Sequence, residues 1–284
     1  MSAPSPLINV MVRAAQKAAK GLRRDFGEVE HLQVSRKGPA DFVSTADKQA
    51  QRVLREELGN ARPSFGFLGE EDDGATATAR AGSANAPAER WIVDPLDGTS
   101  NFLHGLPCWA ISIGAERAGE LIAGVVYNPI LDEMFWAEKG LGAYLNNRRL
   151  RVSARANLDD CLIATGIPFK GSPRPMPEFL AQMAAVMPHV AGIRRWGAAS
   201  LDLAYVAAGR FDGFWEQRLW PWDIAAGLVL VREAGGFVSP LVPEENVLQH
   251  GSLLASNGGI HADLLARLRN APTKADRAHG LLAD

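Results

Sequence analysis

Asp94-Pro95-Leu96-Asp97-Gly98-Thr99 directly follows the apolar run Trp91-Ile92-Val93. Two carboxylates therefore lie three residues apart, where a strand is expected to end. Aspartate is unfavourable in strands, and two such acids cost stability unless a positive group pairs with them. A divalent cation would supply that pairing, and the glycine and threonine that follow would offer backbone N–H groups to an anion. A cation beside an anion indicates phosphate chemistry.

Composition limits the classes of protein that fit this chain. It has 284 residues, of which 47% are hydrophobic and 22% charged, and its formal net charge is -2. This length suits one large domain or two halves that share a core. With no block of like charges in the sequence, binding of nucleic acid through a basic stripe is not expected.

The sequence also indicates a compartment. No apolar run approaches the roughly 20 residues that span a bilayer, and the N-terminus lacks a basic region followed by an apolar signal core. Cys108 and Cys161 lack the spacing of zinc or thioredoxin-type sites. We therefore expect a cytoplasmic protein with no membrane segment and with two buried free thiols.

Apolar periodicity and turn signals divide the chain into helices and strands. Helices are predicted at residues 8–26, 46–58, 177–187, 200–208, 221–234 and 260–268. Strands are predicted at 65–68, 91–93, 111–115, 121–127, 133–137, 162–165, 193–196, 211–215 and 253–256, with a hairpin over 141–152, a turn-rich stretch at 35–40 and a surface loop at 74–89. Because no repeat or linker is visible, we expect one unit over 1–284, with an α+β half at 1–153 that holds most of the metal ligands and an α/β half at 154–284 that holds the substrate pocket.

Four acids are candidate metal ligands: Glu70, Asp94, Asp97 and Asp223. Their hard oxygen donors suit Mg²⁺ or Mn²⁺ and suit zinc poorly. Each also has a structural interpretation. Glu70 could be a solvated acid in a charged loop, Asp97 part of an Asp-Gly turn, and Asp223 an acid that complements a helix dipole. Asp47 could be the far end of a capping box.

Four motifs together resemble the inositol monophosphatase family. They are Asp41-Phe-Val-Ser-Thr-Ala-Asp47, Gly69-Glu-Glu71, Asp94-Pro-Leu-Asp-Gly-Thr-Ser-Asn-Phe102 and Trp222-Asp-Ile-Ala-Ala-Gly227, in the family's order and at its usual separations. The resemblance runs from about residue 8 to residue 268. It implies the layered αβαβα fold of the sugar phosphatases, an α/β architecture, and a homodimer.

The resemblance also implies a set of metal ligands. One Mg²⁺ would be held by Glu70, Asp94 and the Leu96 carbonyl, and a second by Asp94, Asp97 and Asp223. A third, weaker ion would be attached through Glu70 and waters, so that Glu70 counts as catalytic as well as ligating. Such an arrangement is the two-metal clamp around an in-line displacement, in which Mn²⁺ could replace Mg²⁺.

Catalytic roles follow from the same resemblance. Thr99, hydrogen-bonded to Asp47, would orient and deprotonate the attacking water, and the N–H groups of Gly98 and Thr99 would bind the phosphate. A lysine ahead of the first motif would lie near metal-bound waters. Lys37 matches it, although the alignment could shift to Arg36, and a lysine in a surface turn is the alternative.

On the substrate side, two further segments, residues 197–203 and 211–216, follow the family pattern. There the backbone at Ala199 and the carboxylate of Glu216 would meet substrate hydroxyls, as suits inositol or a sugar alcohol; the alternative for Glu216 is a surface acid at a strand end. The expected substrate-binding set is Asp97, Gly98, Thr99, Ala199, Glu216 and Asp223.

The leading functional hypothesis is a Mg²⁺-dependent, lithium-sensitive phosphatase that converts inositol-1-phosphate to inositol and phosphate. Histidinol-phosphate phosphatase is the closest alternative. Relatives that act on fructose bisphosphate, NADP or 3′-phosphoadenosine nucleotides share the metal motifs. An alternative from another class is a transcription antitermination factor that associates with RNA polymerase, because residues 193–197 resemble those of bacterial members with that role. In that segment Arg194 and Arg195 could instead set the dimer.

Overall fold

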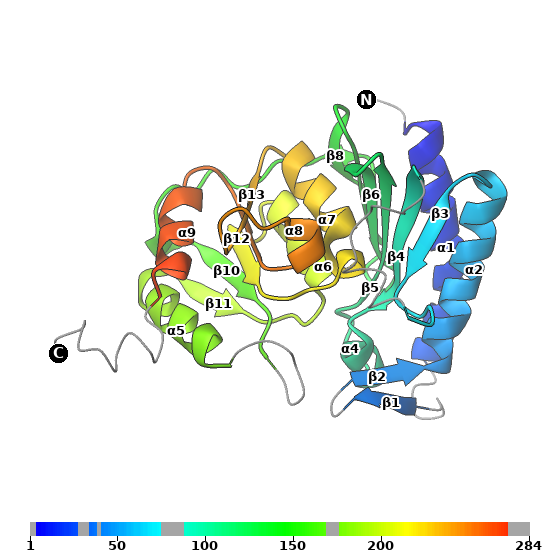
Figure 1. The fold of residues 1–284 in the computed structure, drawn as a ribbon, viewed down its shortest axis with the longest axis horizontal. Coiled ribbons are helices and arrows are strands. Elements are labelled where there is room, and N and C mark those ends of the chain that lie inside the picture. Colours follow the sequence, from blue (N-terminus) through cyan, green and yellow to red (C-terminus); the bar gives the residue numbers. More distant parts are fainter. Residues whose placement is uncertain (1–3, 28–33, 39–40, 75–87, 169–175, 272–284) are drawn as a thin grey trace.

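The computed structural model describes residues 4–27, 34–38, 41–74, 88–168 and 176–271. Helix α1 (Pro6–Phe26) begins at Ser5, whose hydroxyl accepts a hydrogen bond from the Ile8 N–H at 3.2 Å, with proline in the first turn. Its apolar face is buried from Ile8 to Leu22. Helix α2 (Thr45–Ala61) lies beside α1, and the two cover one face of a seven-stranded sheet (Figure 1).

The first sheet follows chain order. Its strands are β3 (Gly66–Gly69), β4 (Glu89–Asp97), β5 (Ala110–Arg117), β6 (Glu120–Asn128), β7 (Glu133–Glu138), β8 (Gly142–Leu145) and β9 (Arg148–Arg149). Strands β3 and β4 are parallel, and every other neighbouring pair is antiparallel. Short helix α4 (Thr99–Leu103) leaves the end of β4, and the hairpin of β1 (Val34–Gly38) and β2 (Asp41–Ser44) lies next to it (Figure 1).

The second sheet has five strands in the order β11, β10, β12, β14, β13. Their bounds are β10 (Leu162–Thr165), β11 (Gly192–Arg194), β12 (Gly213–Glu216), β13 (Phe237–Pro240) and β14 (Leu253–Ser256). Helices α5 (Met176–Val186) and α9 (His261–Arg269) cover its outer face. Two 3₁₀ turns, Leu158–Asp160 and Met187–His189, and short helix α8 (Val247–His250) complete the described elements.

Helices α6 (Ala199–Ala207) and α7 (Pro221–Glu233) lie between the two sheets and share one buried cluster with both (Figure 1). The order from one side to the other is helices, sheet, helices, sheet, helices, so the expected αβαβα architecture is confirmed. Within the described residues, no helix is both long and apolar enough to cross a membrane.

Glycines let α7 approach the first sheet closely. A Cβ atom on Gly124 of β6 would lie 2.5 Å from the Ala226 carbonyl oxygen, and one on Gly114 of β5 would lie 2.7 Å from the Ala225 Cβ. The Ser112 hydroxyl also donates to the Trp222 carbonyl at 3.2 Å. These contacts fix the start of α7 against β5, and the first turn of α7 carries one of the predicted ligands.

Several predictions need correction. The turn-rich stretch at 35–40 includes part of the β1–β2 hairpin, and strand β13 and helix α8 were not predicted. Strand β4 runs on to Asp97 instead of ending at Val93. Cys161 is buried but Cys108 is only half-buried, and both are free; burial raises the pKa of the Cys161 thiol to about 11. Most of the predicted surface loop, residues 75–87, lies outside the described residues.

Candidate active site

Asp94 occupies an irregularity in β4. It is opposite Ser112 and Asp97 is opposite Ala110, so three steps along β4 face two along β5. The extra residue lies between them, in a stretch that includes Pro95, which has no N–H to give to the neighbouring strand. The bulge allows the Asp94 side chain to turn inward, where it is 2% exposed and its Oδ1 accepts the Leu96 N–H at 2.9 Å.

The other predicted acids surround Asp94. Burial, followed by the negative charges of Glu70, Asp97, Asp223 and Asp47, raises its pKa well above the usual value. These acids come from separate elements of the chain. Like charges gathered around a buried carboxylate favour a bound cation, and hard oxygen donors fit Mg²⁺. Within the described part of the chain, however, no group of three or more histidine, cysteine, aspartate or glutamate side chains is arranged to hold a metal ion. The acids match the ion in the chemistry of their donors, which are all carboxylate oxygens.

Glu70 follows β3 in a turn that is held by two polar side chains. Asp72 accepts the Gly69 N–H at 3.1 Å, and Gln51 of α2 accepts the Glu71 N–H at 3.0 Å. Gln51 also donates to Asp72 at 3.1 Å, which closes the network. Sequence reasoning did not find Gln51 or Asp72. An aspartate three residues after a glycine in a turn was the available signal.

Thr99 and Asp47 lie together as the resemblance implied. The Thr99 Oγ1 is 3.3 Å from Asp47 Oδ2 and 3.0 Å from the Leu96 carbonyl oxygen. The hydroxyl has one proton, so it can donate fully to only one of these acceptors. Asp47 is 1% exposed. Gly98 has a φ of 91°, and a Cβ there would lie 2.9 Å from the Cys108 carbonyl oxygen, so glycine is needed for the turn into α4.

Asp97 is held from the other half of the chain. Its Oδ2 accepts hydrogen bonds from the Ser200 N–H at 2.7 Å and the Ser200 hydroxyl at 2.5 Å. Burial raises the pKa of Asp97 to about 6; the Ser200 bonds oppose this rise, and the charge of Glu216 adds to it. Sequence reasoning did not find Ser200, because its partner lies 103 positions away.

Asp223 lies in the first turn of α7, and its Oδ2 accepts the Trp220 N–H at 2.7 Å. The indole ring of Trp220 stacks on that of Trp222, with centroids 5.4 Å apart and planes at 14°. Trp222 and Trp215 are buried in the core. The stacked rings and the hydrogen bond fix the direction in which the Asp223 carboxylate leaves the helix.

The two residues predicted to lie on the substrate side are both buried. Ala199 and Glu216 are each 7% exposed. A Cβ on Gly166 would lie 2.0 Å from the carboxyl carbon of Glu216, so any larger residue there would displace this carboxylate. Near it lies Asp202, an acid that sequence reasoning missed, whose pKa is raised well above normal by burial, Glu216 and Asp97. The Asp202 Oδ1 is buried and accepts no hydrogen bond from the described residues.

The structure places Lys37 on strand β1, where the pairing with β2 is irregular between Arg36 and Gly38. Its side chain lies outside the part of the chain that can be described. The assignment of Lys37 therefore stays a prediction.

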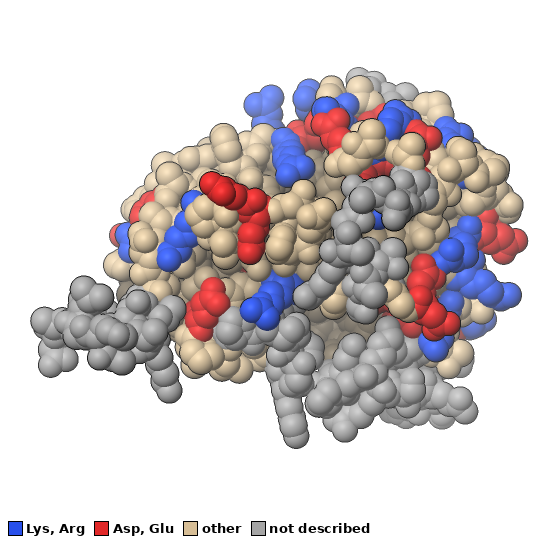
Figure 2. Space-filling model, viewed as in Figure 1, with Lys and Arg blue, Asp and Glu red and all other residues tan. Residues whose placement is uncertain are grey.

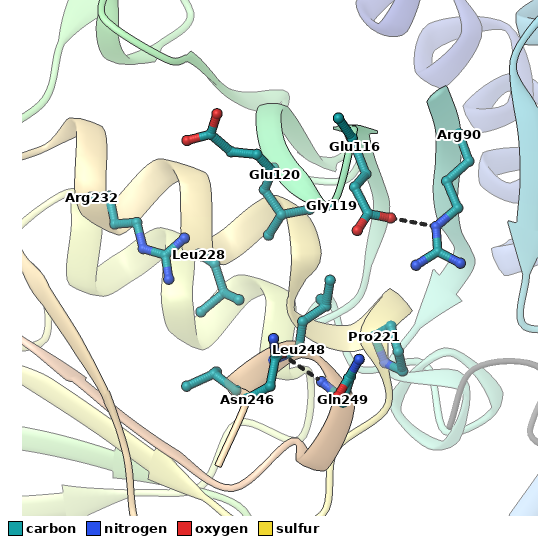
Figure 3. A pocket seen from close by; sticks show the side chains of 13 residues that line it. Arg90, Glu116, Gly119, Glu120, Pro221, Leu228, Arg232, Asn246, Leu248 and Gln249 are labelled. Atoms are coloured by element: carbon teal, nitrogen blue, oxygen red, sulfur yellow. Dashed lines mark hydrogen bonds and ion pairs between the residues drawn. The ribbon is translucent and has the colours of Figure 1, made fainter. Parts of the chain in front are cut away.

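A separate pocket of about 400 Å³ lies on the flank of α7 (Figure 3). It is bounded by α8, the β5–β6 turn and an ion pair between Arg90 and Glu116. Among the residues that line this pocket, Pro221 lies nearest in sequence to a predicted ligand, two residues before Asp223. None of the predicted site residues lines this pocket, so the acid cluster and the pocket are distinct features.

Known proteins resemble this chain in sequence and in fold. A model of the inositol monophosphatase family matches residues 3–273. The chain belongs to this family. It is therefore a phosphatase, and the predicted enzyme class is confirmed. The chain is 56% identical to an inositol-1-monophosphatase of Rhizobium meliloti over 258 residues, which cover 91% of this chain and 94% of that protein.

Two further relatives extend the comparison. The crystal structure of the extragenic suppressor protein suhB from Bartonella henselae matches with a TM-score of 0.85 and 50% identity, covering 94% of this chain and 100% of that one. The Nus factor SuhB of Pseudomonas aeruginosa is 40% identical over 265 residues, which cover 93% of this chain and 96% of that protein. The family thus includes members whose names refer to different cellular roles.

Proposed function

We propose that this protein hydrolyses a small phosphate monoester, with inositol-1-phosphate as its main substrate, in a reaction that depends on Mg²⁺. The convergence of Glu70, Asp97, Asp223 and Asp47 on buried Asp94 is the observation that carries the proposal. The name of the Rhizobium meliloti relative supports the choice of substrate.

Two or three Mg²⁺ ions, which Mn²⁺ could replace, would be held by Glu70, Asp94, the Leu96 carbonyl, Asp97 and Asp223. Bound Mg²⁺ supplies positive charge to the phosphate oxygens and lowers the pKa of water. The hydrogen bonds that hold Asp97 and Asp223 orient these ligands before an ion arrives. The family's metal dependence supports this assignment.

Proton transfer would use Thr99 and Asp47. The Thr99 hydroxyl donates its proton toward Asp47 Oδ2 and accepts a proton from the attacking water on its own Oγ1. Lys37 would lie near the water network. The N–H groups of Gly98 and Thr99 would bind phosphate oxygens, and Glu216 with the Ala199 backbone would orient the hydroxyls of the alcohol.

The decisive experiment measures phosphate release across a panel of monoesters with Mg²⁺, with and without lithium. The panel contains inositol-1-phosphate, histidinol phosphate, fructose bisphosphate, NADP and a 3′-phosphoadenosine nucleotide. We expect the highest kcat/KM for inositol-1-phosphate and inhibition by lithium. No release from inositol-1-phosphate would overturn the substrate, and a higher kcat/KM for histidinol phosphate would replace it.

We further propose a homodimer in the cytoplasm, supported by the family resemblance. Light scattering coupled to size exclusion should give twice the mass of the 30.5 kDa chain. A monomer at micromolar concentration would contradict this expectation.

A second candidate function is association with RNA polymerase in antitermination. The similarity to the Nus factor SuhB of Pseudomonas aeruginosa favours it, and Arg194 and Arg195 are exposed. Lysine, arginine, aspartate and glutamate are interspersed over the face in Figure 2, which supports a protein partner over nucleic acid. Capture of RNA polymerase by the wild type and by the Asp94→Asn variant, but not by Arg195→Ala, would support this role independently of hydrolysis.

A further inference from the structure

Asp97 is a predicted ligand that the other half of the molecule holds in place. It is the last residue of β4 in the first sheet, while two of its hydrogen bonds come from Ser200 in the first turn of α6. Both bonds reach the same oxygen, Oδ2, and they are 2.7 and 2.5 Å long. The hydroxyl and the N–H of one residue therefore both donate to the same oxygen of this carboxylate.

Helix α6 lacks a cap of its own. The residue at its N-cap is Ala198, which makes no side-chain hydrogen bond, whereas Asn246 caps α8 with its side-chain oxygen. The first N–H groups of a helix need acceptors, and a negative group there is favourable. The Asp97 carboxylate fills this role from another layer of the fold. Its position is thus coupled to the docking of α6.

The hydroxyl adds something that the backbone cannot. In the segment Gly197-Ala198-Ala199-Ser200-Leu201, serine alone has a side chain that can donate a hydrogen bond. The terminal torsion of an aspartate is broad, so each donor that reaches the carboxylate narrows its rotation. The backbone of Ala199 and Ser200 supplies N–H donors, and the Ser200 hydroxyl adds a further donor on Oδ2.

We propose that Ser200 is a positioning residue of the divalent-cation site, which fixes Asp97 Oδ2 so that the rest of the carboxylate faces the ion. This inference rests on the proposed metal site, and no motif of the sequence analysis includes Ser200 in that role. The residue need not touch the ion or the substrate. Its effect should therefore be on cation affinity and much less on the rate at saturating cation.

The test measures Mn²⁺ binding by electron paramagnetic resonance on the whole chain without substrate. We expect Ser200→Ala to raise the Mn²⁺ Kd about 10-fold, as loss of an outer partner of a ligand typically does. Ser200→Thr, which keeps the hydroxyl, should stay within about 2-fold of the wild type. With substrate, the Mg²⁺ concentration for half-maximal activity should rise by the same factor in Ser200→Ala, while kcat at saturating Mg²⁺ changes less than about 3-fold.

A matched control is available in Ser153, whose hydroxyl donates to buried Asp212 at 2.5 Å. Ser153→Ala removes the same kind of bond from an acid that is not among the charges around Asp94, and it should leave the Mn²⁺ Kd unchanged. In an Asp97→Asn background, Ser200→Ala should have no further effect on Kd. If Ser200→Ala does not fold by circular dichroism, Ser200→Cys, a weak donor, replaces it in the comparison.

The outcomes separate the two proposals. Wild-type affinity in Ser200→Ala, or the same loss in Ser153→Ala, would overturn the role of Ser200 and leave the metal site standing. A wild-type protein that binds no Mn²⁺ or Mg²⁺ would overturn the metal site itself, and the role of Ser200 with it.

Discussion

Two buried aspartates of this molecule have opposite surroundings. Asp94 is 2% exposed and is surrounded by other acids, while Asp212 is 1% exposed and is surrounded by donors. The Asp212 Oδ1 accepts from Ser153 at 2.5 Å and Arg155 at 3.0 Å, and its Oδ2 accepts the Leu162 N–H at 2.8 Å. Equal burial thus has two meanings. A carboxylate paired with an arginine, as Asp212 is with Arg155, already has a positive partner, and one gathered with other carboxylates is poised for a cation.

The largest expected effect is the loss of hydrolysis when Asp94 is changed. Asp94→Asn keeps the shape of the side chain but removes the charge that two ions would share, so hydrolysis should fall at least about 10³-fold. The same change relieves repulsion among the acids, so the metal-free variant should be at least as stable as the wild type. Urea unfolding in EDTA and phosphate release with Mg²⁺ measure the two effects. An Asp94→Asn variant that is less stable than the wild type in EDTA would contradict the contrast between Asp94 and Asp212.

The second aspartate should show the reverse pattern. Asp212→Ala leaves the Leu162 N–H and the Ser153 hydroxyl without their acceptor, and should lower the free energy of unfolding by roughly 2–4 kcal/mol. The stabilisation by Mg²⁺ should remain, because Asp212 is not among the charges around Asp94. Thermal melts with and without Mg²⁺ test this. An equal loss of Mg²⁺ stabilisation in Asp94→Asn and Asp212→Ala would contradict the distinction between the two aspartates.

A glycine variant tests how the neighbours of Asp94 are brought to it. A Cβ at Gly124 would lie within 2.5–3.0 Å of three backbone atoms of Ala226, so Gly124→Ala must move α7 away from β6. We expect a loss of roughly 1–3 kcal/mol in unfolding free energy, with a weaker Mg²⁺ response because α7 carries Asp223. Gly119→Ala, in the exposed β5–β6 turn, is not a matched control because its φ is 80°. Gly59→Ala in α2, where the added atom meets open space, is the better control.

The comparison of Asp94 with Asp212 also shows which features could be predicted from the sequence. The Asp94 motif was predictable because its chemistry is local: two aspartates, a proline and a glycine lie within six residues. The role of Asp212 was not, because Ser153, Arg155 and Leu162 reach it from 50 or more positions away. Ser200 was missed for the same reason. Strand β13 was missed because its first residue, Phe237, is 55% exposed and it ends in a proline, so it lacks the alternation of a half-buried strand.

A third ionisable group extends the comparison and has the smallest expected effect. His261 begins α9, half-buried, with Nε2 at 2.8 Å from the Ser239 hydroxyl and Nδ1 at 2.7 Å from the Ser256 hydroxyl. Burial, and then the charge of Arg269, lower the pKa of His261 below its ordinary 6.5. Its surroundings therefore favour a neutral ring.

The sign of the pH effect follows from that shift. Because the unfolded chain binds the proton first as pH falls, the stability from neutral His261 is fully present above about pH 6.5 and declines as pH drops toward the folded-state pKa. His261→Gln should therefore lose less stability than the wild type between pH 7.5 and 5.5, although it is less stable at pH 7.5. Urea unfolding at both pH values measures the difference, with His250→Gln on the surface as the control. Parallel losses in wild type and His261→Gln would mean that the ring holds its proton equally well in the folded and unfolded chain, and that its hydroxyl partners do not select the neutral form.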